Sequence, residues 1–145
     1  MPRKLTALVL GLLFAQLPKM VLGTVFGQTQ NIVAELFPGF YPYVVETMPA
    51  FDLLTAYAMA FVTGFAFWGG TAESWRASGA WAASGCVALM AFGGAYEHRV
   101  FLALAILARV AGAFHGAGWG ERNKDDPRVE GVQAFVFRIN PFRLS

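Results

Sequence analysis

Two cations lie inside long apolar stretches of the sequence and are the residues there with the clearest chemical potential. Lys19 follows Pro18 within the stretch 5–26, and Arg109 lies near the middle of the stretch 100–118. A charged side chain in hydrocarbon costs at least about 2.5 kcal/mol on insertion scales. Each of these cations therefore needs a counter-charge, hydrogen-bond acceptors or a bound ligand.

Polar residues at helical spacing are predicted to lie close to Lys19. Gln16 lies one turn before Lys19 on the same helix face, and Asp52 and Thr55 begin the next apolar stretch. A lysine side chain can extend toward the membrane surface, so an ion pair between Lys19 and Asp52 is predicted. One carboxylate cannot neutralise two cations, so Arg109 also needs carbonyls, an amide, water or a ligand oxygen. The predicted polar cluster, which either stabilises the bundle or binds a ligand, consists of Gln16, Lys19, Asp52, Thr55 and Arg109.

The sequence contains no recognisable catalytic or metal-binding pattern. The single cysteine, Cys86, lies in an apolar run, and His98 and His115 are about 25 Å apart on one predicted helix. The two histidines therefore cannot share one metal ion within the chain. Serine-hydrolase, zinc-protease, paired-carboxylate and phosphate-loop motifs are all missing. We predict no metal site, no required cofactor and no enzyme activity, while a bound lipid, quinone or pigment stays open.

Small residues recur at four-residue spacing in the stretch that contains Arg109. Such a row lets a neighbouring helix approach closely within a membrane. We therefore expect this face to be buried against protein rather than exposed to lipid. The predicted helix-packing face consists of Ala108, Gly112, Gly116 and Gly120.

Four apolar stretches position these residues, each near the roughly 20 residues that a helix needs to cross a bilayer. The predicted spans cover 5–26, 51–68, 77–96 and 100–118. Hydrophobic residues make up 57% of the 145 residues and charged residues only 14%, which argues against a disordered chain and an ordinary soluble enzyme. A net charge of +2 gives no support to a nucleic-acid partner. We predict an all-α fold, a four-transmembrane-helix bundle.

Two segments outside the spans are predicted to lie at the membrane surface. After the first span, residues 28–37 form a short interfacial helix that Pro38 and Gly39 terminate, with a lid over a substrate pocket as the alternative. The tail 121–145 begins with charged residues and then becomes partly apolar, so it lies on the inner surface or docks on another subunit. The predicted division is a four-span membrane domain, 1–120, and this tail.

Basic residues predict the orientation of the chain. Arg3 and Lys4 precede the first span, and the loop after that span carries acidic residues but no cation. By the positive-inside rule, both termini lie on the cytosolic, matrix or stromal side of the membrane. The basic residues that follow the last span are Arg122, Lys124, Arg128, Arg138 and Arg143.

The first apolar stretch resembles the opening of the DoxX-like four-helix membrane proteins. Those proteins often begin with an apolar motif that contains two glycines, a phenylalanine and a lysine. The chain matches this motif at Gly11, Phe14 and Lys19, although the second glycine is absent. Asp52 at the start of the second stretch and the glycine-rich segment 115–118 are also similar to the family. The resemblance implies an accessory membrane subunit, sometimes linked to quinone or thiol redox chemistry, and it supplies no catalytic residue.

Three hypotheses for function follow. The first is a non-catalytic membrane subunit of a larger complex, of respiratory or photosynthetic type, with membrane lipids and other membrane subunits as partners. The second is a DoxX-like redox accessory protein with a quinone or lipid site near Lys19, Asp52 and Arg109. The third is a small transporter or channel subunit whose intramembrane cations line a path. The packing face and the lack of a catalytic set favour the first.

Overall fold

The computed structural model describes residues 2–71, 73–92 and 98–139, and within these ranges the chain is helical and contains no strand. Three apolar helical segments are long enough to cross a membrane, which supports a membrane-embedded, multi-pass chain. The all-helical class is therefore confirmed, and three of the four predicted spans coincide with helices that are long and apolar enough to cross a membrane. In chain order the elements are α1 (Pro2–Phe14), α2 (Gln16–Leu36), η1 (Pro38–Phe40), α3 (Tyr41–Glu46), α4 (Met48–Gly70), α5 (Trp75–Ala88), η2 (Leu89–Phe92), α6 (Arg99–Arg122) and α7 (Pro127–Ile139).

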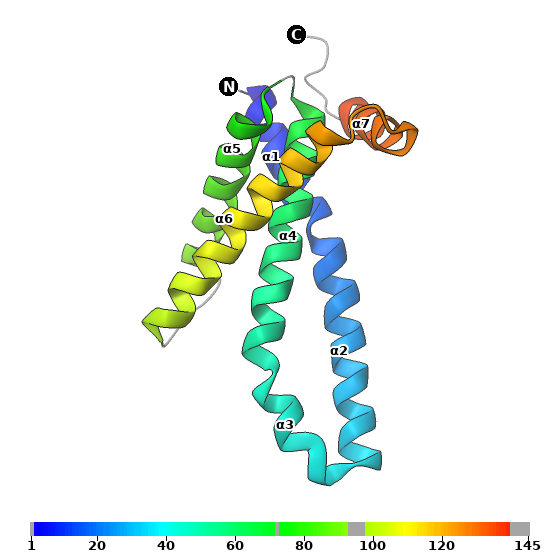
Figure 1. Cartoon of the computed structure of the whole chain (residues 1–145), viewed down its shortest axis with the longest axis vertical. Helices are drawn as coiled ribbons and strands as arrows, with labels where there is room; N and C mark the ends of the chain where they lie inside the picture. The colour runs from blue at the N-terminus through cyan, green and yellow to red at the C-terminus, as the bar shows by residue number, and fades with distance from the viewer. Residues whose placement is uncertain (1, 72, 93–97, 140–145) are drawn as a thin grey trace.

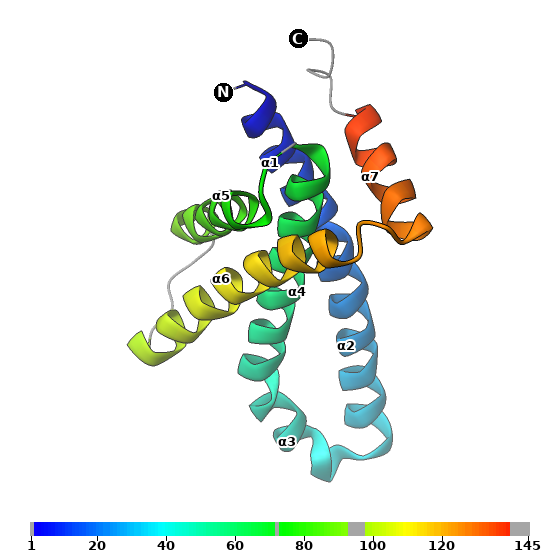
Figure 2. The same ribbon diagram turned by 45° about the horizontal axis from the view of Figure 1, so that its top comes forward.

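The first apolar stretch forms two helices that meet at Ala15. α1 ends at Phe14, α2 begins at Gln16, and the helix axis changes direction there (Figure 2). Pro18 explains the position of the break, because it has no amide hydrogen for the Phe14 carbonyl four residues earlier. The combined segment Lys4–Leu36 has 33 residues, and at about 1.5 Å per residue it is longer than the roughly 30 Å of a hydrocarbon core.

The prediction of a separate helix at 28–37 is wrong. α2 continues through this segment to Leu36, because a single glycine and a run of amide side chains lower helix propensity without stopping the helix. The helix does end before Pro38, as predicted, and Pro38 is the first residue of η1. The two long helices and the short elements between them form a hairpin that extends beyond the rest of the bundle (Figure 1).

The third predicted span, 77–96, is shorter than expected as a regular helix. α5 has 14 residues, about 21 Å, and the chain then tightens into the four residues of η2. The last residues of the predicted span lie outside the described ranges. Ser74 begins α5 as its N-cap, since its hydroxyl accepts a hydrogen bond from the Ala77 amide at 3.4 Å.

The centre of the fold is the crossing of α4 and α6 (Figure 2). At Gly64, an added Cβ would collide with the Ala113 carbonyl, and at Gly116 it would collide with the Phe61 carbonyl. Neither clash involves a side chain that can rotate away, so the two backbones touch at these glycines. Gly79 brings α5 close to the Phe114 side chain of α6, whose Cδ1 atom would lie 2.6 Å from an added Cβ. The helices of the bundle can therefore pack closely because glycines, which have no side chain, lie at their contacts.

The C-terminal tail docks on the bundle of its own chain. Asp126 begins α7 by accepting a hydrogen bond from the Arg128 amide at 2.8 Å, and Pro127 occupies the first helical turn. Val129 is 3% exposed and packs with Trp68 and Ala117. The tail therefore needs no other subunit to hold its first turn in place.

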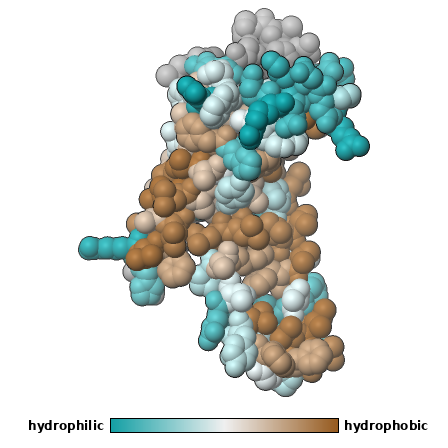
Figure 3. Space-filling model, viewed as in Figure 1, coloured by the Kyte–Doolittle hydropathy of each residue, from teal (hydrophilic) through white to brown (hydrophobic). Residues whose placement is uncertain are grey.

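Charged side chains gather at the end of the molecule where α1 begins and α7 lies. Figure 3 shows hydrophilic residues over this end and hydrophobic residues across the middle of the molecule. Lys4 pairs there with Glu73 at 2.7 Å, which links the start of α1 to the turn between α4 and α5. This distribution has the form expected of a bundle with one charged surface and an apolar girdle.

Candidate functional site

Arg109 lies on α6 with its side chain half-buried. Its Nη1 atom donates to the Ala105 carbonyl of the same helix at 3.1 Å. Within the described ranges this is the one hydrogen bond of a guanidinium that has five N–H donors. Most of its hydrogen-bonding capacity is therefore available to lipid, water, a ligand or another protein.

Lys19 and Asp52 do not form the predicted ion pair. Both side chains are exposed, and no ion pair joins them in the described part of the chain. The register of the hairpin explains this: Phe26 stacks on Phe51 at a ring distance of 4.1 Å. Asp52 is therefore level with a turn of α2 that is seven residues, about 10 Å, beyond Lys19.

The other polar residues of the predicted cluster are distributed over separate helices. Gln16 donates from Nε2 to the Leu12 carbonyl at 3.2 Å, across the break between α1 and α2. The Thr55 hydroxyl oxygen on α4 is buried and has no partner among the described residues. α2 packs on α4, whereas α6 packs on α4 and α5, so Lys19 and Arg109 are carried by helices on different sides of α4.

A buried polar contact that the predicted cluster omitted joins α1 to α4. Thr63 is fully buried, and its hydroxyl donates to the Met59 carbonyl at 2.8 Å, with the Gly11 carbonyl at 3.5 Å. An added Cβ at Gly11 would lie 3.1 Å from the Thr63 carbonyl oxygen, so the helices are close at this point. The thiol of Cys86 on α5 is buried beside the Thr63 hydroxyl. This contact is structural, because its hydroxyl is occupied by a helix carbonyl.

The predicted packing face of α6 is occupied by α4 of the same chain. Gly112, Gly116 and Gly120 are buried, whereas Ala108 is half-buried. Added Cβ atoms at the three glycines would meet the Tyr57 carbonyl, the Phe61 carbonyl and the Trp68 ring in turn. This small-residue face therefore holds the bundle together and does not remain free for a partner.

A different small-residue face remains free on α2. The helix has no buried residue. Gly23 and Gly27 face open space, since no atom of the described residues lies within 4 Å of an added Cβ at either position. They share the helix face of Lys19, one and two turns further along. The exposed apolar residues beside this face are Leu17, Met20, Val21 and Val25.

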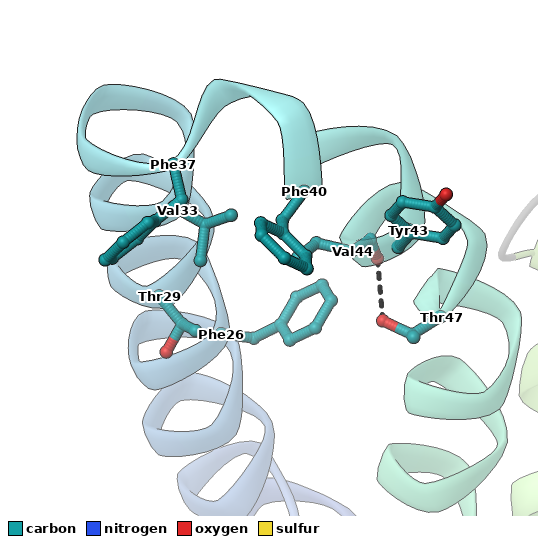
Figure 4. A pocket seen from close by; sticks show the side chains of 8 residues that line it. All are labelled: Phe26, Thr29, Val33, Phe37, Phe40, Tyr43, Val44 and Thr47. Atoms are coloured by element: carbon teal, nitrogen blue, oxygen red, sulfur yellow. Dashed lines mark hydrogen bonds between the residues drawn. The ribbon is translucent and has the colours of Figure 1, made fainter.

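A pocket of about 540 Å³ lies at the tip of the hairpin (Figure 4). The Thr29 and Thr47 hydroxyls at its wall donate to the Val25 and Val44 carbonyls, at 2.8 and 2.6 Å. The Tyr43 hydroxyl points away from the ring of Phe26 (Figure 4). The pocket therefore offers apolar surface, and its volume suits a lipid tail or a similar apolar group. Its lining residues are Phe26, Thr29, Val33, Phe37, Phe40, Tyr43, Val44 and Thr47.

An aromatic row along α4 and α6 is the feature that the sequence analysis missed. The Tyr57 hydroxyl on α4 forms a hydrogen bond with Nδ1 of His115 on α6. Phe61 contacts the rings of both His115 and Trp119. The sequence does contain a signal for this row, because aromatic residues recur every four positions at Tyr57, Phe61 and Phe65, and His115 and Trp119 have the same spacing.

No family model matches this chain, and neither the curated proteins nor the solved structures include a significant match. The DoxX-like assignment therefore stays a prediction. Among the described residues, no group of three or more histidine, cysteine or acidic side chains is placed to hold a metal ion.

Proposed function

We propose that this chain is a non-catalytic integral membrane subunit that binds a transmembrane partner through α2. The observation that supports the proposal is Lys19, which is exposed on a helix without buried residues and forms no ion pair within the described ranges. Lys19 lies 15 residues, about 22 Å, from Lys4 at the charged end of the same apolar segment. A cation at that depth favours a partner that carries a carboxylate.

The partner surface is a row formed by Lys19, Gly23 and Gly27, which we name the α2 face. The two glycines have open space before them, so a second helix can approach the backbone of α2 closely. The partner is then a transmembrane helix with an aspartate or glutamate level with Lys19 and small side chains opposite the glycines. An assembly of respiratory or photosynthetic type, including one that transports electrons, fits these requirements.

The proposed subunit crosses the membrane four times. α5 and η2 together extend about 29 Å, close to the thickness of a hydrocarbon core, so they make up the fourth crossing. Both termini are then on one side. The basic residues at that end support the cytosolic, matrix or stromal side for both termini. These residues are Lys4, Arg76, Arg122, Lys124 and Arg128.

The mass of the particle extracted from native membranes tests the subunit role. The chain has a mass of 15.7 kDa. We expect native mass spectrometry in a mild detergent to show a larger particle that contains at least one other transmembrane protein. Isolation of the chain alone, under conditions that preserve other membrane complexes of the same preparation, would contradict the proposal.

A second candidate function, supported by the pocket at the hairpin tip, is binding of a lipid or an isoprenoid tail. This retains the ligand-binding role of the second hypothesis and moves the site away from Lys19, Asp52 and Arg109. The Thr29 and Thr47 hydroxyls at the pocket wall donate to helix carbonyls, and the Tyr43 hydroxyl points away from Phe26 (Figure 4), so the ligand is recognised by its apolar part.

Filling the pocket tests this second candidate. We expect Val33→Trp to remove a tightly bound lipid from the purified protein, because the indole occupies the volume that the tail would fill. Ile32→Trp is the matched control, since Ile32 directly precedes Val33 in α2, is exposed and is not part of the lining. The measurement is the lipid content in native mass spectra, and equal lipid content in both variants would exclude the pocket as a site.

A further inference from the structure

The hydrogen bond between Tyr57 and His115 lies on the outside of the α4–α6 crossing. The Tyr57 side chain is half-buried and that of His115 is exposed. The two side chains can meet because Gly112, one turn before His115, brings α6 against the Tyr57 carbonyl. The pair therefore lies beside a close contact between the backbones of α4 and α6.

In the membrane-spanning arrangement proposed above, the pair lies within the apolar part of α4 and α6. His115 is seven residues, about 10 Å, from Arg122 at the end of α6. Tyr57 is 13 residues, about 20 Å, from the end of α4 at Gly70. Both helices are among the three that are apolar and long enough to span a membrane. An unpaired donor at this depth is costly, because hydrocarbon offers no acceptor.

Counting protons shows that the pair always has a donor left over. If the Tyr57 hydroxyl donates to Nδ1, the proton of the neutral His115 ring is on Nε2 and is unused. If Nδ1 donates to the Tyr57 oxygen instead, the phenol proton is unused. If the His115 ring is protonated, both the Nε2–H and the Tyr57 O–H are unused. Neither residue has a second hydrogen bond in the described part of the chain.

Aromatic side chains form an apolar wall beside this donor. Phe61 meets the His115 ring edge-on, with centroids 5.4 Å apart and an angle of 86° between the planes. Trp119 lies 6.1 Å from Phe61 and is 39% exposed. A donor next to flat apolar surface suits a molecule that has a carbonyl oxygen attached to a hydrophobic body.

We propose that Tyr57 and His115 bind a carbonyl-bearing membrane amphiphile. The carbonyl oxygen accepts the unused N–H or O–H of the pair, and the hydrophobic body packs on Phe61 and Trp119. Two sources have this chemistry: the ring of a quinone and the ester of a phospholipid. The site is on α4 and α6 and includes no residue of the α2 face, so it is independent of the partner proposed above.

Ether-linked lipids, which contain no carbonyl group, allow a direct test. The purified chain is reconstituted in nanodiscs of ether-linked phospholipid and titrated with decylubiquinone, and binding is followed by infrared spectroscopy of a ¹³C-labelled quinone carbonyl. We expect a downshifted carbonyl band, and binding about 3- to 10-fold weaker in the double variant Tyr57→Phe/His115→Phe, which removes both donors of the pair, the loss that corresponds to one neutral hydrogen bond. His115→Gln, which keeps an N–H donor, is expected to retain part of the shift.

His98→Phe is the matched control, because His98 is exposed beside the other end of α6 and its ring contact is with Phe101. If the quinone does not bind, the same variants are compared in ester-linked and ether-linked nanodiscs. A stabilisation of the wild type by ester lipid that Tyr57→Phe/His115→Phe abolishes and His98→Phe keeps identifies the phospholipid ester as the ligand. No effect of Tyr57→Phe/His115→Phe in either experiment, with the helical circular dichroism of the variants unchanged, would overturn the proposal.

Discussion

Replacing Gly116 by alanine is expected to separate α6 from α4 and to destabilise the whole bundle. The new methyl group would collide with the Phe61 carbonyl, and a backbone atom of a packed helix cannot rotate away. Overpacking of this kind costs typically 1–3 kcal/mol, and we expect about 3 kcal/mol because both helices must move. Unfolding in sodium dodecyl sulfate, followed by circular dichroism, measures the change in free energy.

Gly27→Ala is the control for this experiment, since it makes the same substitution within another long helix where an added Cβ meets nothing within 4 Å. Alanine favours helix over glycine, so this variant should be as stable as the wild type or slightly more stable. Equal stability of the Gly116 and Gly27 variants would show that α4 and α6 are not in contact through their glycines.

Replacing Lys19 by leucine is expected to leave the stability of the isolated chain intact and to weaken its binding to the partner. In the isolated chain the substitution removes a cation that has no ion pair within the described ranges, so stability should be unchanged or higher. In the complex it leaves the partner carboxylate unpaired in the membrane, which costs about 3–5 kcal/mol. Binding should therefore weaken by at least about 100-fold.

The yield of co-purified partner and the unfolding curve of the isolated chain measure these two effects. Lys124→Leu is the control, because Lys124 is an exposed residue in a weak pair with Glu121 at 3.8 Å, outside the apolar part of the chain. Loss of stability in isolated Lys19→Leu would show that Lys19 has a structural role within its own chain, and the α2 face would then lose its main support.

Local chemistry made parts of the fold predictable from the sequence. Pro18 fixes the break between α1 and α2, because the missing amide hydrogen acts at a known distance along the helix. Gly112 and Gly116 were expected to be buried against protein, and their four-residue spacing was sufficient for that prediction. The identity of the neighbour was not predictable, because small residues occur on α2, α4 and α5 as well.

The relative register of neighbouring helices could not be predicted from the sequence, and this limited the prediction of the site. Lys19 and Asp52 have opposite charges, and each lies near the same predicted surface, but the Phe26–Phe51 stack offsets them along the hairpin. The sequence contains no signal that specifies this offset. The contact between Tyr57 and His115 was missed for the same reason, since their meeting depends on how α4 and α6 cross.

The proposed role as a subunit depends on a carboxylate opposite Lys19, and a membrane-permeant carbodiimide tests this most directly. The reagent joins an amine to a carboxylate in contact with it, without a spacer. In native membranes, we expect a cross-linked peptide that joins Lys19 to an aspartate or glutamate in a transmembrane helix of another protein. The ion pair of Lys4 and Glu73, with its 2.7 Å separation, is the internal positive control. Cross-linking of Lys4 to Glu73 in a sample where Lys19 stays unmodified would contradict the proposed binding of a transmembrane partner through Lys19.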